Sequence, residues 1–207
     1  MGIAPSVIAI SNQISSSRFV EYPWILLNLG KECHRVLDVG SVGSTLPVLL
    51  ACQGYRVHCI DVRFYECANI LSTLKSVIGD IRRTKFQADF FDGVIAVSTI
   101  EHVGLGRYGD SMDNNGDVKA VIEIRRILKK GGEFLLTVPY GKHTITPSHR
   151  VYDKNMLPSL LTGFCIVTSQ CFSKKGAVWF PSSPDELSNV DSSVIEKGVI
   201  CLKLRKT

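Results

Sequence analysis

The sequence predicts an α/β fold, a doubly wound and mostly parallel sheet of seven strands with helices on both faces. An apolar run from Val36 to Val39 ends at a turn containing Gly40 and Gly43. Such a run is typical of a buried strand that leads into a helix. A second apolar run ends on Asp61, twenty-one residues after Gly40. This spacing is typical of a nucleotide-binding βαβ unit, and strand and helix patterns alternate through the rest of the chain.

Length and charge limit the classes of protein that we consider. A chain of 207 residues is long enough for one well-buried domain, so we expect a single domain over 1–207, with 1–17 loosely ordered. The net charge of +5 comes from scattered lysines and arginines. This pattern does not favour a nucleic-acid binder, and a small or anionic ligand fits it better.

Cysteine usage and hydropathy indicate where the protein works. The seven cysteines include no C-x-x-C pair and several lie in apolar runs, so we expect reduced, structural thiols and no metal site. No apolar run reaches the eighteen residues that a membrane span needs. We therefore expect a cytoplasmic protein without a membrane span. The sequence does not indicate an oligomeric state.

The predicted elements follow one another from about residue 19. Strands are expected over 35–39, 56–61, 76–81, 94–97, 133–139, 164–168 and 199–204. Helices are expected over 19–30, 45–52, 65–74, 117–128 and 154–161, several of them ended by glycine. The connection between the last two strands is rich in Ser and Pro and has no regular pattern.

A loop over 98–110 follows the fourth predicted strand and is dense in Gly and polar residues. Ligands of open α/β sheets bind at the carboxyl ends of the strands, so this loop is expected at the site. His102 lies in it and titrates near neutrality, which makes it our candidate general base. Glu101 is expected to orient His102 or to bind the substrate. The alternative is that both residues only anchor the loop.

The motifs together resemble the class I S-adenosylmethionine-dependent methyltransferases, which have a Rossmann-like fold. The segment 38–44 is similar to the acid and glycine turn of that family, although its glycines are in a different register. Segments 79–81 and 127–139 also match the family at the corresponding places. The resemblance implies that S-adenosylmethionine is the cofactor, with Asp61 on the ribose and Asp80 and Ile81 at the adenine. The full set of cofactor-binding residues that it implies is Asp38, Gly40, Ser41, Gly43, Ser44, Asp61, Val62, Asp80, Ile81 and Ser98.

A narrower resemblance joins segments 21–24, 98–110 and 149–153 to a subgroup associated with polysaccharide biosynthesis. It implies O-methylation of a small polar acceptor such as a sugar or glycan precursor. The residues expected to bind an anionic group on that acceptor are Arg107, Tyr108, Tyr140, Lys142, His149, Arg150 and Tyr152.

Two rival functions stay open. A nicotinamide-dependent oxidoreductase shares the first βαβ unit, but it favours a G-x-G-x-x-G turn that this chain lacks. A non-catalytic cofactor-binding protein of the same fold is compatible with the altered glycine register. A metal-assisted reaction is not expected, because Ser98 stands where related metal-using enzymes carry an acid.

Overall fold

A central eight-stranded sheet organises the structure, a computed structural model that describes residues 16–66 and 70–207. The strand order is β3-β2-β1-β4-β5-β10-β8-β9. The first five strands in this order run parallel, and β10, β8 and β9 are antiparallel to their neighbours. Their bounds are β1 Arg35–Val39, β2 Arg56–Asp61, β3 Leu74–Ile78, β4 Phe91–Val97, β5 Leu128–Pro139, β8 Phe164–Lys175, β9 Val178–Ser182 and β10 Gly198–Lys206.

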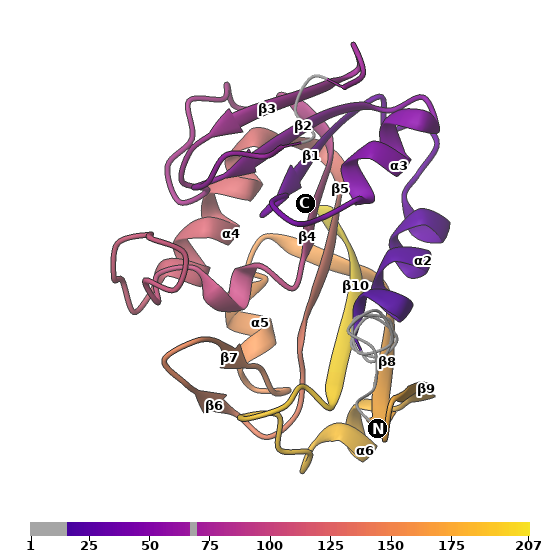
Figure 1. Cartoon of the computed structure of the whole chain (residues 1–207), viewed down its shortest axis with the longest axis vertical. Coiled ribbons are helices and arrows are strands. Elements are labelled where there is room, and N and C mark those ends of the chain that lie inside the picture. The colour runs from indigo at the N-terminus through magenta and orange to yellow at the C-terminus, as the bar shows by residue number, and fades with distance from the viewer. Residues whose placement is uncertain (1–15, 67–69) are drawn as a thin grey trace, which may run out of the picture.

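Helices cover both faces of this sheet, as the sequence predicts. Helices α2 (Arg18–Asn28) and α3 (Leu46–Cys52) lie on one side, and α4 (Gly116–Ile127) and α5 (Met156–Leu160) on the other (Figure 1). Along β1 the side chains alternate between two cores, because successive residues of a strand face opposite ways. Val36 packs with the α2 and α3 side, and Leu37 with the α4 and α5 side. The doubly wound α/β fold is therefore confirmed.

The sheet has one strand more than predicted. The eighth strand, β9, comes from the Ser/Pro-rich connection and pairs with residues 171–175 of β8. Its Pro181 is tolerated because β9 is at the edge of the sheet, where one side of the strand needs no donor. A separate pair of short strands, β6 (Thr144–Ile145) and β7 (Arg150–Val151), follows β5. A short helix, α6 (Pro184–Leu187), precedes β10.

The segment after β2 differs from the prediction. A helix was expected over 65–74, but Tyr65, Glu66 and residues 70–73 are not helical and lead through turns and bends into β3, which begins at Leu74, and 67–69 lie outside the described residues. The predicted third strand is displaced as well, since β3 covers Leu74–Ile78 rather than 76–81. The expected loose order of 1–17 concerns mainly residues that the structure does not describe. Of this range, Ser16 and Ser17 are described, and Ser17 is the N-cap of α2.

The parallel strands end at a common edge, and the loops that follow them bring the predicted site residues together. The 40–44 turn follows β1, Asp61 ends β2, and a 3₁₀ turn η1 (Ile100–His102) follows β4. None of the helices within 16–66 and 70–207 is long and apolar enough to cross a membrane.

Candidate functional site

A cleft, partly open to solvent, lies at the carboxyl ends of β1, β2 and β4. Six of the ten residues predicted to bind a cofactor line it, namely Gly40, Asp61, Val62, Asp80, Ile81 and Ser98. A smaller pocket adjoins it and is lined by Asp38, Gly43 and Ser44, three of the remaining four. The tenth, Ser41, is fully buried and donates to the backbone carbonyl of Asp38 at 3.1 Å.

The two glycines of the turn are needed for different physical reasons. Both have positive φ, +78° at Gly40 and +79° at Gly43, a region that side chains disfavour. A Cβ on Gly40 would collide with the Oγ1 of Thr99, whereas a Cβ on Gly43 would meet nothing within 4 Å. Thr99 cannot simply move away, because its hydroxyl bonds the carbonyl oxygens of Val39 and Val97. Gly40 therefore allows the β1 and β4 loops to touch.

Asp61 is buried at the end of β2 with both carboxylate oxygens in use. Its Oδ2 accepts from the backbone N–H of Val42 at 3.1 Å, which ties it to the glycine turn. Its Oδ1 accepts from the backbone N–H of Arg63 at 3.0 Å. The Arg63 guanidinium adds two more bonds, Nε to Oδ1 at 3.1 Å and Nη2 to Oδ2 at 3.3 Å.

Asp80 is held by an arginine in the same way. Arg82 stands two residues later, as Arg63 does after Asp61, and its Nη2 lies 2.6 Å from the Oδ2 of Asp80. The same guanidinium donates to the carbonyl oxygen and the hydroxyl of Ser111. This network keeps the pKa of Asp80 below its usual range, because the hydrogen bonds and the charge of Arg82 outweigh the opposing effect of burial. The loop after η1 is thereby connected to the surroundings of Asp80.

The smaller pocket combines a cation and a buried acid. Arg18, from the first turn of α2, lines both the cleft and this pocket. Asp38 is 3% exposed, and burial raises its pKa to about 7, although Ser41 and Arg18 act in the opposite direction. A group with a carboxylate and an ammonium would find a partner for each here. Arg18 lies outside every motif, so the sequence did not predict it at this site.

His102 lines the cleft in a defined tautomer. Its Nδ1 lies 2.5 Å from the carbonyl oxygen of Ser148, which only accepts, so Nδ1 carries the proton and Nε2 the lone pair. The ring also contacts Tyr108 edge-on at 5.5 Å between centroids. Burial lowers the pKa of His102 to about 4, with a smaller opposing effect from the Ser148 bond. The imidazole is therefore neutral at pH 7, and the expectation that His102 titrates near neutrality is wrong because the folded protein buries the ring.

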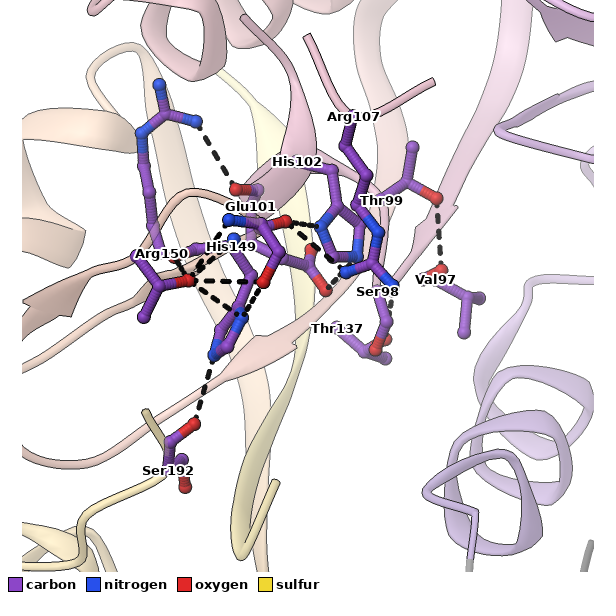
Figure 2. Close-up of polar contacts among 12 residues, drawn as sticks. Val97, Ser98, Thr99, Glu101, His102, Arg107, Thr137, His149, Arg150 and Ser192 are labelled. Carbon is purple, nitrogen blue, oxygen red and sulfur yellow. Dashed lines mark hydrogen bonds and ion pairs between the residues drawn. The ribbon is translucent and has the colours of Figure 1, made fainter. Parts of the chain in front are cut away.

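Glu101 lies beside His102, with its Oε1 3.6 Å from Nε2 (Figure 2). The residue is 1% exposed, and within the described part of the chain Oε2 has no hydrogen-bond partner. Burial raises the pKa of this carboxyl well above its usual range. A neutral carboxylic acid here has a donor and an acceptor to offer. A second buried acid, Glu21 of α2, instead accepts from the hydroxyls of Ser98 and Thr137 and pairs with Arg18, whose Nη1 lies 2.8 Å from its Oε2.

One of the seven predicted acceptor-binding residues lines the cleft, and a second is its neighbour. Tyr108 lines it, and Arg107 is an exposed neighbour whose Nη1 lies 3.4 Å from the Ser148 carbonyl that also holds His102. The other five do not line the cleft: Tyr140, Lys142, His149, Arg150 and Tyr152. Of these, Lys142 is exposed, whereas the Nε2 of His149 bonds the carbonyl of Ser192 at 3.0 Å.

Arg150 and Tyr152 are internal supports of the loop, so the predicted acceptor role does not fit them. Arg150 is 2% exposed, and its guanidinium donates to the carbonyls of Glu101, Val103 and Asn114 (Figure 2 shows the Glu101 bond). The hydroxyl of the fully buried Tyr152 donates to Asp117 at 2.9 Å. Because their polar atoms serve the protein itself, both residues position η1 rather than a ligand.

A family model described as "Caenorhabditis protein of unknown function, DUF268" matches residues 56–203. The chain belongs to the DUF268 family. No curated protein sequence matches this DUF268 chain significantly. The matched region begins at β2 and includes Asp61, Asp80 and the 98–110 loop, but not the glycine turn.

Solved structures share the fold of this DUF268 protein. A SAM-dependent methyltransferase from Methanosarcina mazei has a TM-score of 0.64 at 15% identity, covering 88% of this chain and 96% of that one. A 1,6-didemethyltoxoflavin-N1-methyltransferase from Burkholderia thailandensis, solved with S-adenosylhomocysteine, has a TM-score of 0.62 at 16% identity and covers 100% and 92%. The [4+2]-cyclase SpnF has a TM-score of 0.60 at 17% identity and covers 96% and 80%. At these identities the likeness concerns the fold, which is Rossmann-like.

Proposed function

We propose that this protein is an S-adenosylmethionine-dependent methyltransferase that acts on a small polar acceptor. The observation that carries the proposal is the convergence of Asp61, Asp80 and His102 on one cleft at the carboxyl ends of the parallel strands. Two carboxylates suit a nucleoside, and a neutral imidazole suits removal of a proton beside it.

The residues present fit the cofactor. Asp61 would accept from the ribose hydroxyls, and Ile81 would pack on the adenine ring. Arg82 donates four bonds to the Asp80 carboxylate, so Asp80 would accept from the adenine amine in place of one of them. In the adjoining pocket, Arg18 and Asp38 would meet the carboxylate and the ammonium of the amino-acid end. When bound, S-adenosylmethionine supplies a methyl group that is activated by a sulfonium.

The chain's own contribution is positioning and proton removal. Methyl transfer is an in-line displacement, so holding the acceptor atom in line supplies most of the rate enhancement. His102 lines the cleft, and its lone pair is on Nε2 because Ser148 holds Nδ1–H. That lone pair would take the proton of an acceptor hydroxyl as the new bond forms. Glu101 does not line the cleft, so its proposed role is to orient the His102 ring, with its Oε1 3.6 Å from Nε2.

For the acceptor we propose a hydroxyl of a sugar or glycan precursor. Support comes from His102, since a hydroxyl must lose a proton whereas a neutral amine is already nucleophilic. Arg107 at the cleft mouth adds a cation suited to a phosphate or carboxylate on that acceptor. The resemblance of segments 21–24, 98–110 and 149–153 to proteins associated with polysaccharide biosynthesis points in the same direction.

Three other functions would use the same cleft. The fold of SpnF, a cyclase, shows that this architecture also serves reactions other than methyl transfer. A protein that binds the cofactor without turnover would need the same acids. A nicotinamide-dependent oxidoreductase is less favoured because the 40–44 turn has no G-x-G-x-x-G pattern.

Calorimetric titration with S-adenosylmethionine and with NAD separates these functions. We expect heat of binding with the first ligand and none with NAD, and loss of that heat in Asp61→Ala. Incubation with methyl-labelled S-adenosylmethionine and a panel of sugar nucleotides and sugar phosphates then tests for transfer. Binding of NAD in preference to S-adenosylmethionine would contradict the proposal, and binding of S-adenosylmethionine without transfer to any hydroxyl would support the non-catalytic alternative.

A further inference from the structure

The Arg63 side chain occupies the lone pairs of Asp61 that a ribose would need. A carboxylate offers about four lone-pair sites, two on each oxygen. The backbone N–H groups of Val42 and Arg63 take one on each oxygen, and the guanidinium of Arg63 takes the other two. A vicinal diol and this guanidinium therefore compete for the same two positions. Arg63 is free to leave, because its side chain is 40% exposed.

Arg63 also belongs to a second group of residues, at the mouth of the cleft. Its Cζ lies 4.3 Å from the centroid of the Tyr108 ring. Arg107 lies over the same ring, with its Cζ at 5.2 Å. Cations over an aromatic face are stabilised by the ring, so Tyr108 can keep both guanidiniums near the mouth. Arg107 makes no ion pair with a carboxylate of residues 16–66 or 70–207.

These two observations determine what happens when the diol binds. While Arg63 is paired with Asp61, its charge is neutralised and only Arg107 is available to an anion. When a ribose takes the carboxylate, Arg63 loses its counter-charge but keeps its place over Tyr108. Two guanidiniums held at the same ring can attract one oxyanion strongly, because each can donate two parallel N–H bonds. Tyr108 contacts the His102 ring, so this anion site borders the candidate base.

We propose that Arg63 exchanges partners, from Asp61 to an anionic group of the acceptor, when a nucleoside diol occupies Asp61. Arg63 and Arg107 on Tyr108 then form the acceptor's oxyanion site, which is complete only after the cofactor has bound. The acceptor class is accordingly a small molecule with a phosphoryl or carboxylate group near its hydroxyl. This inference rests on the proposed function, since it takes Asp61 to be the ribose site. Coupling is reciprocal by thermodynamic necessity, so the anion must tighten cofactor binding by the same factor.

Calorimetry with S-adenosylhomocysteine, inorganic phosphate and acetate tests the exchange at constant ionic strength. In the wild type we expect phosphate or acetate to bind about 5- to 10-fold tighter with S-adenosylhomocysteine present than without it, the size of a typical coupling. The stronger of the two anions identifies the acceptor's group. In Arg63→Gln the nucleoside is expected to bind several-fold tighter than in the wild type, and the enhancement of anion binding disappears. In Arg107→Gln we expect binding of the anion to be lost and the affinity for the nucleoside to equal that of the wild type.

Arg56→Gln is the matched control, because Arg56 is exposed at the opposite end of β2 and its loss removes the same charge. It is expected to behave as the wild type, and circular dichroism checks that each variant is folded. Binding of the nucleoside with no effect of the anion, or equal or weaker nucleoside binding in Arg63→Gln, overturns this inference and leaves the proposed function standing. No nucleoside binding in the wild type or in Arg63→Gln overturns both.

Discussion

The Nδ1 atom of His102 lies 2.5 Å from the carbonyl oxygen of Ser148, and this contact decides which nitrogen of the imidazole is basic. A carbonyl oxygen accepts only, so Nδ1 must donate, and the lone pair is left on Nε2. Ser148 lies between β6 and β7, far from His102 in the sequence but beside it in space. The tautomer of the candidate base is thus set by a segment that follows β5.

Replacing His102 by Ala is expected to reduce methyl transfer by about 10²- to 10⁴-fold, the usual contribution of general base catalysis. Binding of S-adenosylmethionine should change little, because Asp61 and Asp80 remain. Initial rates with labelled methyl donor and calorimetry on the same preparation measure both quantities. His34→Ala, at an exposed position, serves as the control and should keep wild-type turnover. Unchanged turnover in His102→Ala would remove His102 from the mechanism.

The titration of His102 gives a second, independent prediction. Burial lowers its pKa to about 4, so the ring should stay neutral as the pH falls from about 8 to about 5. The unfolded chain protonates this imidazole near pH 6.5, so His102 contributes stability above that pH, which is lost as the pH falls from about 6.5 to about 4. An NMR titration of the ring protons, assigned with His102→Ala, measures the midpoint. A midpoint at or above about 6.5 would contradict the burial argument.

The order of strands and helices could be predicted because it depends on local patterns. Val36 to Val39, Arg56 to Asp61 and residues 199–204 are apolar runs bounded by turns, and all three lie in strands. The missed strand β9 carries Pro181 and alternates weakly, so its pairing with β8 depends on tertiary contact. The helix expected over 65–74 has a moderate pattern, but the described part of that segment is not helical.

The same distinction between local patterns and tertiary contacts applies to the candidate site. Gly40, Asp61 and Asp80 lie at or within two residues of the carboxyl ends of strands, so the topology alone brings them to one edge. Arg150 was misassigned because sequence does not show that its guanidinium is buried against backbone carbonyls. Arg63 could have been found from a local signal, since an arginine stands two residues after each of the two acids.

Gly40 and Gly43 form a matched pair for substitution by Ala. Both have nearly the same positive φ, so each Ala carries about 1–2 kcal/mol of backbone strain. Only at Gly40 does the new Cβ collide with Thr99, which adds about 1–3 kcal/mol of overpacking. Denaturant unfolding should therefore rank Gly40→Ala as clearly less stable than Gly43→Ala. The double variant Gly40→Ala with Thr99→Ala should recover part of the difference, and equal losses in the two single variants would refute the steric argument.

Arg150→Met is expected to lower the free energy of unfolding by about 3–5 kcal/mol. The change leaves Asp117 without its buried ion-pair partner at 3.5 Å and removes the donor from the carbonyls of Glu101 and Val103. Arg56→Met, on the surface, should change the free energy by less than about 0.5 kcal/mol. Chemical denaturation of both variants measures the difference. A loss below about 1 kcal/mol in Arg150→Met would mean that the loop does not depend on this guanidinium.

Asp38 should make the protein less stable as the pH rises. This pH dependence is opposite in direction to that of a carboxylate whose pKa is lowered by folding. Its pKa is raised to about 7 in the folded state by burial, against 3.8 when unfolded. Between these values the folded state binds more protons, so the stability that Asp38 contributes is present below about pH 4 and is lost as the pH rises through 7. An amide at this position does not titrate. The free energy of unfolding of Asp38→Asn should therefore rise relative to that of the wild type by up to about 4 kcal/mol between about pH 4 and pH 8, because each pKa unit corresponds to about 1.4 kcal/mol. Guanidinium unfolding of both proteins at about pH 5 and pH 8 measures the gap, and a gap that does not widen with pH would show that the Asp38 carboxylate is stabilised in the ionised form.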